Sequence, residues 1–115
     1  MTSSPASDLS PLSTPVLHIL LALGRDRLHG YGIMQAIEEK TAGVARILPG
    51  TLYTTLNRML ADGLVEEAAP PNDAPDDDRR RRYYRITPAG RKAVAAEAER
   101  MSMLLELARR DLRIS

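Results

Sequence analysis

Hydrophobic residues recur with a helical period over the first half of the chain. An apolar run from Val16 to Leu23 follows Thr14 and Pro15, residue types that favour the cap and the first turn of a helix. Gly24 then favours the end of that helix. The pattern therefore predicts a first helix that is apolar around most of its circumference.

Two further helices follow from the same pattern. Ile33 and Ile37 lie in an apolar stripe of the segment Gly30–Thr41, whose other positions include glutamine, glutamate and lysine. A third helix is predicted over Pro49–Asp62, because proline is favoured in a first helical turn and because Gly63 suits the left-handed residue that ends a helix.

Beyond the third helix the period changes to that of β strands. The segments Leu64–Glu67 and Arg80–Thr87 alternate in polarity, and the residues between them, PPNDAPDDD at 70–78, are typical of a loop. We therefore expect a hairpin with a long, charged tip. A terminal helix is predicted from Pro88 to about Arg113, with Thr87 as its cap.

The predicted order is helix, helix, helix, strand, loop, strand, helix, which is the order of a winged helix-turn-helix with an added terminal helix. The expected fold class is therefore mainly α with a small β-hairpin. Residues 1–12 are rich in serine and proline and have little to bury, so we expect them to form a mobile arm ahead of the folded part.

The third helix has two faces of different chemistry. At 100° per residue, Leu52, Leu56 and Met59 fall on one side, and the opposite side carries hydroxyls, an amide and an arginine but no glutamate. Such side chains donate to phosphate oxygens and base edges, and arginine pairs with guanine through two hydrogen bonds. The residues expected to contact DNA on this helix are Thr51, Tyr53, Thr54, Thr55, Asn57 and Arg58. The alternative is an ordinary solvated helix.

A cluster of basic residues follows the acidic loop. Its members, on or next to the last predicted strand, are Arg79, Arg80, Arg81, Arg82 and Arg85. In a hairpin beside a recognition helix, these arginines would reach the phosphate backbone or a minor groove. The alternative is that they are merely solvated, or that the aspartates at 76–78 neutralise them locally.

Apolar residues of the terminal helix form a heptad seam. The seam runs through Val94, Ala98, Met101, Leu105, Ala108 and Leu112, and Leu104 and Leu107 widen it. Because so long a helix outruns a three-helix domain, another surface must cover the seam. We expect a second copy related by a two-fold axis, with Val16, Leu17 and Leu20 of the first helix in the same interface. The alternative is packing of the seam against the first helix of the same chain.

Composition and motifs exclude several classes of function. The chain has no cysteine, which excludes disulfides, zinc thiolate sites and thiol nucleophiles, and which fits a reducing compartment. The formal net charge is +1, so only the placement of the charges informs on partners. The longest apolar run is too short to span a bilayer, and the first residues lack the basic start of a signal peptide. We expect a soluble, cytoplasmic protein without a membrane partner.

No catalytic or metal site is expected. His29 and Tyr31 in the motif HGYG have no cluster of carboxylates or further histidines that would complete a ligand set. No nucleophile stands beside a base, no Gly-rich phosphate loop is present, and the aspartates at 76–78 have too few companions to hold a metal ion tightly. We therefore expect no enzyme activity, no metal and no cofactor.

Three blocks of the sequence resemble the PadR family of transcriptional regulators. They are LHGYGI at 28–33, PGTLYTTLNRMLADGLV at 49–65 and RRYYRITPAG at 81–90, in the order and spacing of that family. The resemblance covers nearly the whole chain from Leu12 onward. It implies a winged-helix repressor that dimerises through its C-terminal region and responds to small molecules or other cues.

The resemblance also implies roles for single residues. The third helix would be the recognition helix, with Tyr53 on a backbone phosphate and Arg58 as the arginine of an LxRL pattern. At the start of the second helix, Tyr31 would pack and His29 would tie a turn.

Two positions depart from the family pattern. Thr54 stands where the family usually has proline, and it could add a base or phosphate contact. Leu48 stands where a serine or a similar cap is usual, which leaves the third helix without a side-chain cap. Neither departure threatens the fold, but both leave the operator sequence open.

These expectations combine into one hypothesis, a homodimeric PadR-like repressor. Its DNA-binding domain would span residues 13–87 and its dimerisation helix residues 88–115. Its partners would be a double-stranded, pseudo-palindromic DNA operator, a second copy of itself, and a small-molecule inducer at the dimer interface, where Met101 and Met103 could line a space. The rival hypothesis is a winged-helix protein-interaction module without sequence-specific DNA binding.

Overall fold

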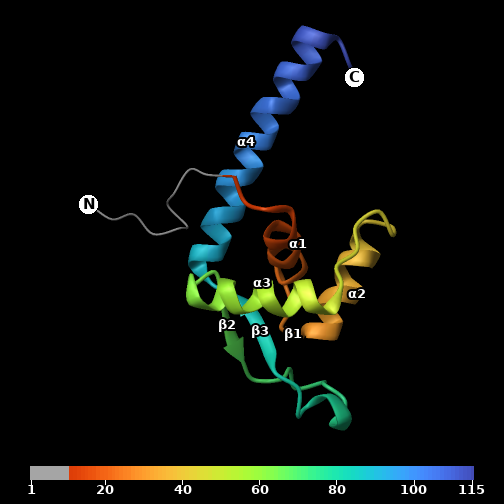
Figure 1. Ribbon diagram of the computed structural model, residues 1–115, viewed down its shortest axis with the longest axis vertical. Coiled ribbons are helices and arrows are strands. Elements are labelled where there is room, and N and C mark those ends of the chain that lie inside the picture. Colours follow the sequence, from red (N-terminus) through yellow and green to blue (C-terminus); the bar gives the residue numbers. More distant parts are fainter. Residues whose placement is uncertain (1–10) are drawn as a thin grey trace, which may run out of the picture.

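The computed structural model describes residues 11–115 and has a helical body, a small β sheet at one end and a long helix at the other (Figure 1). The elements in chain order are α1 (Thr14–Ala22), β1 (Leu28–His29), α2 (Gly30–Lys40), α3 (Pro49–Ala61), β2 (Val65–Ala68), a short 3-10 helix η1 (Asp76–Asp78), β3 (Tyr83–Ile86) and α4 (Pro88–Leu112). The predicted fold class, mainly α with a small β-hairpin, is confirmed. The predicted N-terminal arm lies outside the described residues except for its last two positions.

Side-chain caps begin α1, α2 and α4. At α1 the hydroxyl of Ser13, rather than that of Thr14, accepts the N–H of Val16. Ser13 has the extended backbone of a cap, with φ −65° and ψ 155°, whereas Thr14 is already helical, so the predicted cap was wrong by one residue. At α4 the hydroxyl of Thr87 accepts the N–H of Gly90 at 3.0 Å, as predicted.

The sheet has three antiparallel strands in the order β1-β3-β2. Gly63 follows the end of α3 with a φ of +77° and turns the chain into β2, as its position in the sequence predicted. β2 and β3 form the predicted hairpin, but β3 begins at Tyr83, so the arginines at 80–82 belong to the loop. Strand β1 was not predicted, because two residues are too few to show an alternating pattern. It places His29 opposite Tyr83.

One hydrophobic core joins the first three helices to the sheet and to the start of α4. Its fully buried large side chains are Ile19, Leu20, Leu23, Ile33, Leu52, Leu56, Met59 and Val65. The first turn of α4 comes close to this core at Gly90, where an added Cβ would clash with the backbone oxygen of Leu64. The absence of a side chain at that position lets α4 start directly against β2.

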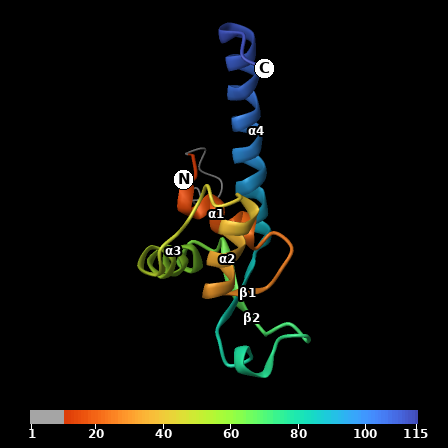
Figure 2. The ribbon, with the colours of Figure 1, turned by 90° about the vertical axis from the view of Figure 1, so that its right-hand side faces the viewer.

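The second half of α4 leaves the body of the molecule (Figure 1, Figure 2). From Met101 to Leu112 every side chain except that of Ala108 is exposed. The wing tip, defined here as residues 70–82, projects at the opposite end of the molecule (Figure 1). The result is an elongated shape with extents of 53 × 41 × 25 Å.

Candidate nucleic-acid interface

Helix α3 separates an apolar face from a polar one, as its sequence predicted. Leu52, Leu56 and Met59 are fully buried and fix the helix on the core. The opposite side chains are exposed, namely Thr51, Thr54, Asn57 and Arg58, and Thr55 is half-buried at the edge of this face. The exposed face presents hydroxyls, an amide and one guanidinium, with no carboxylate among them. This chemistry suits the donors and acceptors of DNA.

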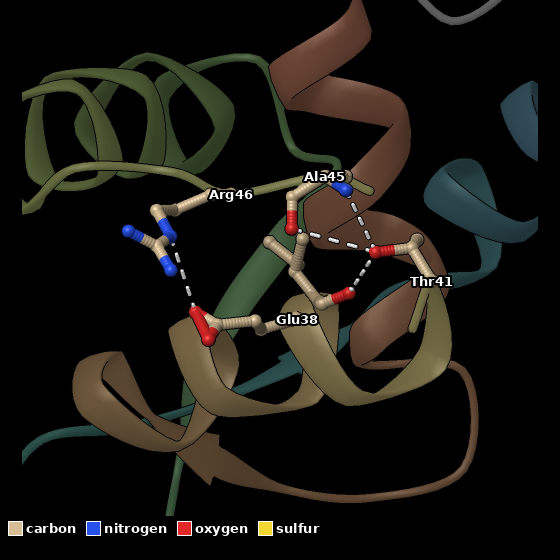
Figure 3. A network of polar contacts seen from close by, with 5 residues as sticks. Glu38, Thr41, Ala45 and Arg46 are labelled. Carbon is tan, nitrogen blue, oxygen red and sulfur yellow. Dashed lines mark hydrogen bonds and ion pairs between the residues drawn. The ribbon is translucent and has the colours of Figure 1, made fainter. Parts of the chain in front are cut away.

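The turn between α2 and α3 is fixed by a polar network (Figure 3). The hydroxyl of Thr41 donates to the carbonyl of Ile37 at 2.8 Å and accepts the N–H of Ala45 at 2.9 Å. Arg46 forms an ion pair with Glu38 at 3.4 Å, and both side chains are largely exposed, so that pair contributes less than about 1 kcal/mol. The bonds of the Thr41 hydroxyl to the backbone therefore fix the first part of the turn that leads from α2 to α3.

Two tyrosines flank the start of α2. Tyr53 of α3 lies directly over Gly30, where any Cβ would collide with its ring and hydroxyl, and 47% of Tyr53 remains exposed. Tyr31 was expected to pack, but it is 52% exposed and only stacks on the ring of His29, with centroids 6.5 Å apart. Sequence reasoning therefore missed Tyr31 as a surface residue beside α3. The motif HGYG did not reveal this, because neighbours in a helix do not face one another and so do not determine whether the ring is covered.

His29 ties the start of α2, as expected. Its Nδ1 accepts the N–H of Gly32 at 2.9 Å and caps the helix. The ring also meets the edge of Tyr83 at a centroid distance of 5.3 Å. His29 is therefore a structural residue at the joint between α2 and the sheet.

Two wing arginines pair with glutamates of the neighbouring strand. Arg82 donates to both carboxylate oxygens of Glu67 at 3.0 Å, and Arg85 donates to Glu66 at 2.6 Å. The hydrogen bonds from Arg82 lower the pKa of Glu67. Arg82 also lies 5.6 Å from the ring centroid of Tyr84, a cation–π geometry. Both arginines are exposed, yet each already has an anionic partner.

The other three arginines of the wing tip differ from one another. Arg81 pairs with Asp78 at 3.0 Å, and Arg79 donates to the backbone oxygen of Pro71 at 3.1 Å. Arg80 is exposed and has no ion pair or side-chain hydrogen bond among residues 11–115. The aspartates at 76–78 were considered as local partners that could neutralise the arginines. Within residues 11–115 one such pair is present, between Arg81 and Asp78.

The residues predicted for a dimer interface fall into three groups. The exposed group comprises Ala98, Met101, Leu104, Leu105, Leu107 and Leu112. The half-buried group comprises Val16, Leu17, Val94 and Ala108, of which Val16 and Val94 pack on the chain's own core. Leu20 forms a group of its own, because it has no exposed surface and packs inside the domain. Leu20 is therefore a core residue, and its assignment to an interface was wrong.

The described residues show neither a metal-binding cluster nor a membrane-spanning helix. Among residues 11–115 no group of three histidines or carboxylates lies where it could hold a metal ion. No helix in this part of the chain is both long and apolar enough to cross a membrane.

Comparison with known proteins places the chain among transcriptional regulators. The transcriptional regulator PadR-like family matches residues 19–96. Transcriptional regulator Rv3488 of Mycobacterium tuberculosis is 42% identical over 96 residues, which cover 84% of this chain and 80% of that protein.

Solved structures with the same fold are also regulators. A transcriptional regulator from Clostridium thermocellum has a TM-score of 0.68 at 26% identity and covers 86% of this chain and 96% of its own. A PadR family transcription regulator from hypervirulent Clostridium difficile R20291 has a TM-score of 0.70 at 19% identity and covers 87% of this chain and 99% of its own. At that lower identity the similarity supports the fold alone.

Proposed function

Because this chain belongs to the transcriptional regulator PadR-like family, we propose that it represses transcription as a homodimer bound to a pseudo-palindromic DNA operator. The family is one of regulators and not of enzymes. The observation that carries the proposal is the exposed face of α3, which has hydroxyls, an amide and a guanidinium but no carboxylate.

This face would read the major groove. Thr51, Thr54 and Arg58 stand in a row along its exposed side, and the small hydroxyls let the helix axis approach the bases closely. Tyr53 and Tyr31 flank the start of α2 with their rings half-exposed, which suits contacts to backbone phosphate. Bases would thus be read by α3, and position on the duplex would be set by the tyrosines.

The wing would contact the sugar–phosphate backbone. Arg79, Arg80 and Arg81 lie on the projecting tip and are exposed. Arg82 and Arg85 must leave Glu67 and Glu66 before they can pair with phosphate. We therefore expect the salt dependence of binding to report fewer phosphate contacts than the number of wing arginines.

The dimer would form through α4. Its second half carries apolar side chains in heptad positions that the body of the same chain leaves uncovered. A two-fold axis along this helix would place two copies of α3 about 34 Å apart, the spacing of successive major grooves. An inducer would bind between the protomers, where the flexible side chains of Met101 and Met103 are exposed.

Fluorescence anisotropy tests the proposal. A labelled duplex from the region upstream of the chain's own gene is titrated with protein at about 50 and 200 mM salt, beside a scrambled duplex of the same composition. We expect tight binding that prefers the native duplex and weakens steeply with salt. Equal, weak binding of both duplexes at both salt concentrations would contradict the operator proposal and favour a protein-interaction module, whose apolar contacts barely respond to salt.

A further inference from the structure

His29 links α2 to the wing tip. Its Nδ1 accepts the N–H of Gly32, so in the neutral ring the hydrogen lies on Nε2. That Nε2 faces Oδ2 of Asp78 at 3.6 Å, an ion-pair distance rather than a direct hydrogen bond. The ring cannot turn away from Asp78 without giving up the cap of α2. The start of α2 thus presents a fixed N–H toward a carboxylate of the wing tip.

Asp78 uses both of its carboxylate oxygens. Oδ2 faces His29 of the body, and Oδ1 accepts Nε of Arg81 at 3.0 Å. Asp78 is also the least exposed of the three aspartates in η1, whereas Asp76 and Asp77 are exposed and have no ion pair among residues 11–115. One carboxylate therefore connects the helical body to an arginine of the tip.

Few polar contacts join the wing tip to the helical body. The helix η1 buries no residue, and Arg79 bonds only to backbone oxygens of the same loop, those of Pro71 and Asn72. Among the polar contacts of residues 11–115, that of His29 with Asp78 is the one that joins the segment 70–81 to the helical body. The contact is sheltered, since the two side chains are 14% and 29% exposed.

We propose that His29 and Asp78 are positioning residues for DNA recognition. Their contact holds the wing tip against the start of α2 and so fixes where Arg79, Arg80 and Arg81 stand relative to α3. This inference rests on the proposed DNA-binding function. A tip that is ordered before binding loses less conformational freedom on the DNA, so the link strengthens binding without touching the duplex.

Matched variants separate this role from charge. Asp78→Asn removes one negative charge and so weakens the contacts of residue 78 with His29 and Arg81, whereas Asp77→Asn removes the same charge from an exposed neighbour. His29→Asn keeps an oxygen that can cap Gly32 but is too short to face Asp78. Circular dichroism first establishes that each variant folds. If His29→Asn does not fold, the comparison of the two aspartate variants decides alone.

Two measurements follow. Amide hydrogen exchange of residues 76–82 in the free protein should be faster in Asp78→Asn and His29→Asn than in the wild type, and unchanged in Asp77→Asn. Fluorescence anisotropy with the operator duplex should show that His29→Asn and Asp78→Asn each weaken binding about 3–10-fold. The double variant, which carries both substitutions, should bind no more weakly than the weaker binder of the two single variants. Asp77→Asn should bind slightly more tightly, because a repulsive charge is gone.

Equal behaviour of Asp78→Asn and Asp77→Asn in both measurements would overturn the inference and leave the proposed function standing. So would additive losses in the double variant. If the wild-type protein prefers no operator duplex, the proposed function fails, and the inferred role in recognition fails with it. The two failures are distinguishable, because the exchange experiment contains no DNA.

Discussion

Arg58 is exposed on α3 and forms no ion pair or side-chain hydrogen bond with another residue in the described part of the chain. We expect Arg58→Ala to weaken operator binding by about 1–3 kcal/mol and to relax the preference at one base pair. Arg58→Lys keeps the charge but loses two-pronged pairing, so it should recover non-specific affinity alone. Titrations against single-base operator variants measure this. An equal loss on random DNA would show that Arg58 holds only phosphate.

Gly90 is required by packing rather than by its backbone angles. An added Cβ would meet the carbonyl oxygen of Leu64, which is backbone and cannot swing aside, and the side chain of Ile86. We expect Gly90→Ala to lower the free energy of unfolding by about 1–3 kcal/mol. Gly50→Ala, where nothing lies within 4 Å, is the control and should be neutral or slightly stabilising in urea unfolding. Equal stability of the two variants would refute the close approach.

At the scale of single residues, exposure along α3 could be predicted and the pairing of the wing arginines could not. The helical period placed Leu52 and Met59 inside and Arg58 outside. The partners of the wing arginines depend on the register of the hairpin, which sets Glu66 opposite Arg85. A long loop with no regular period does not reveal that register from sequence.

Helix α3 begins without a side-chain cap, as its sequence predicted. Leu48 has the extended backbone of a cap residue, with φ −84° and ψ 153°, and is 67% exposed, so little packing would be lost on replacing it. We expect Leu48→Ser to raise the free energy of unfolding by about 1 kcal/mol over Leu48→Ala, which lacks both the cap and the apolar side chain. Thermal unfolding of the two variants checks this, and indistinguishable curves would mean that no cap forms.

A buried carboxylate joins α4 to the segment before α1. Glu97 accepts the backbone N–H of Leu12 and Nε of Arg100, each at 3.3 Å. Hydrogen bonding from Arg100 is the main cause that lowers the pKa of Glu97. The carboxylate of Glu97 therefore takes up a proton more readily in the unfolded chain than in the folded one. Its contribution to the free energy of unfolding is complete above the pKa of the unfolded chain and is lost as the pH falls.

We therefore expect the melting temperature of the wild type to fall more steeply than that of Glu97→Gln between about pH 5 and pH 3. Glu99→Gln is the matched control, since Glu99 is exposed and has no ion pair among residues 11–115, and it should follow the wild type. Thermal unfolding over that pH range measures both. A constant difference between wild type and Glu97→Gln would show that this carboxylate does not contribute to the acid sensitivity.

At the scale of elements, the helices and the hairpin were predicted, and β1 was not. Long periodic segments determine their own structure, whereas the two residues of β1 become a strand only because β3 lies beside them. The predicted strand from Arg80 was too long for a similar reason. Arg80 and Arg81 have no partner strand to pair with, so they stay in the loop.

The whole molecule has an apolar surface on α4 that its own body does not cover. We expect Leu105→Glu, at a position 46% exposed on the heptad seam, to yield monomers or aggregates. Ala96→Glu is the control, because Ala96 is exposed and lies about 180° around the helix axis from Leu105. Analytical ultracentrifugation gives the mass of both variants. An unchanged dimer in Leu105→Glu would place the interface elsewhere.

At this scale the sequence predicted the uncovered seam of α4 but wrongly added Leu20 of α1 to the same interface. An apolar pattern identifies the face of a helix that will be covered, but it does not say whether the same chain or a second copy covers that face. Leu20 has the same apolar character as Leu17, yet it turns into the domain while Leu17 stays half-exposed. The packing of α1 against α2, α3 and α4 distinguishes the two, and that depends on contacts far apart in the chain.

The network around Thr41 has a consequence for the duplex. Its bonds to Ile37 and Ala45 fix the turn that leads from α2 toward α3. Ile37 of α2 and Leu52 of α3 also lie in the same core, so we expect the two helices to move together and α3 not to tilt alone to follow an imperfect groove. The bending needed to seat two such units must then come from the DNA. Pyrimidine–purine steps deform at the lowest cost, so we expect affinity to vary with the spacer between the half-sites, at base pairs that no side chain reaches.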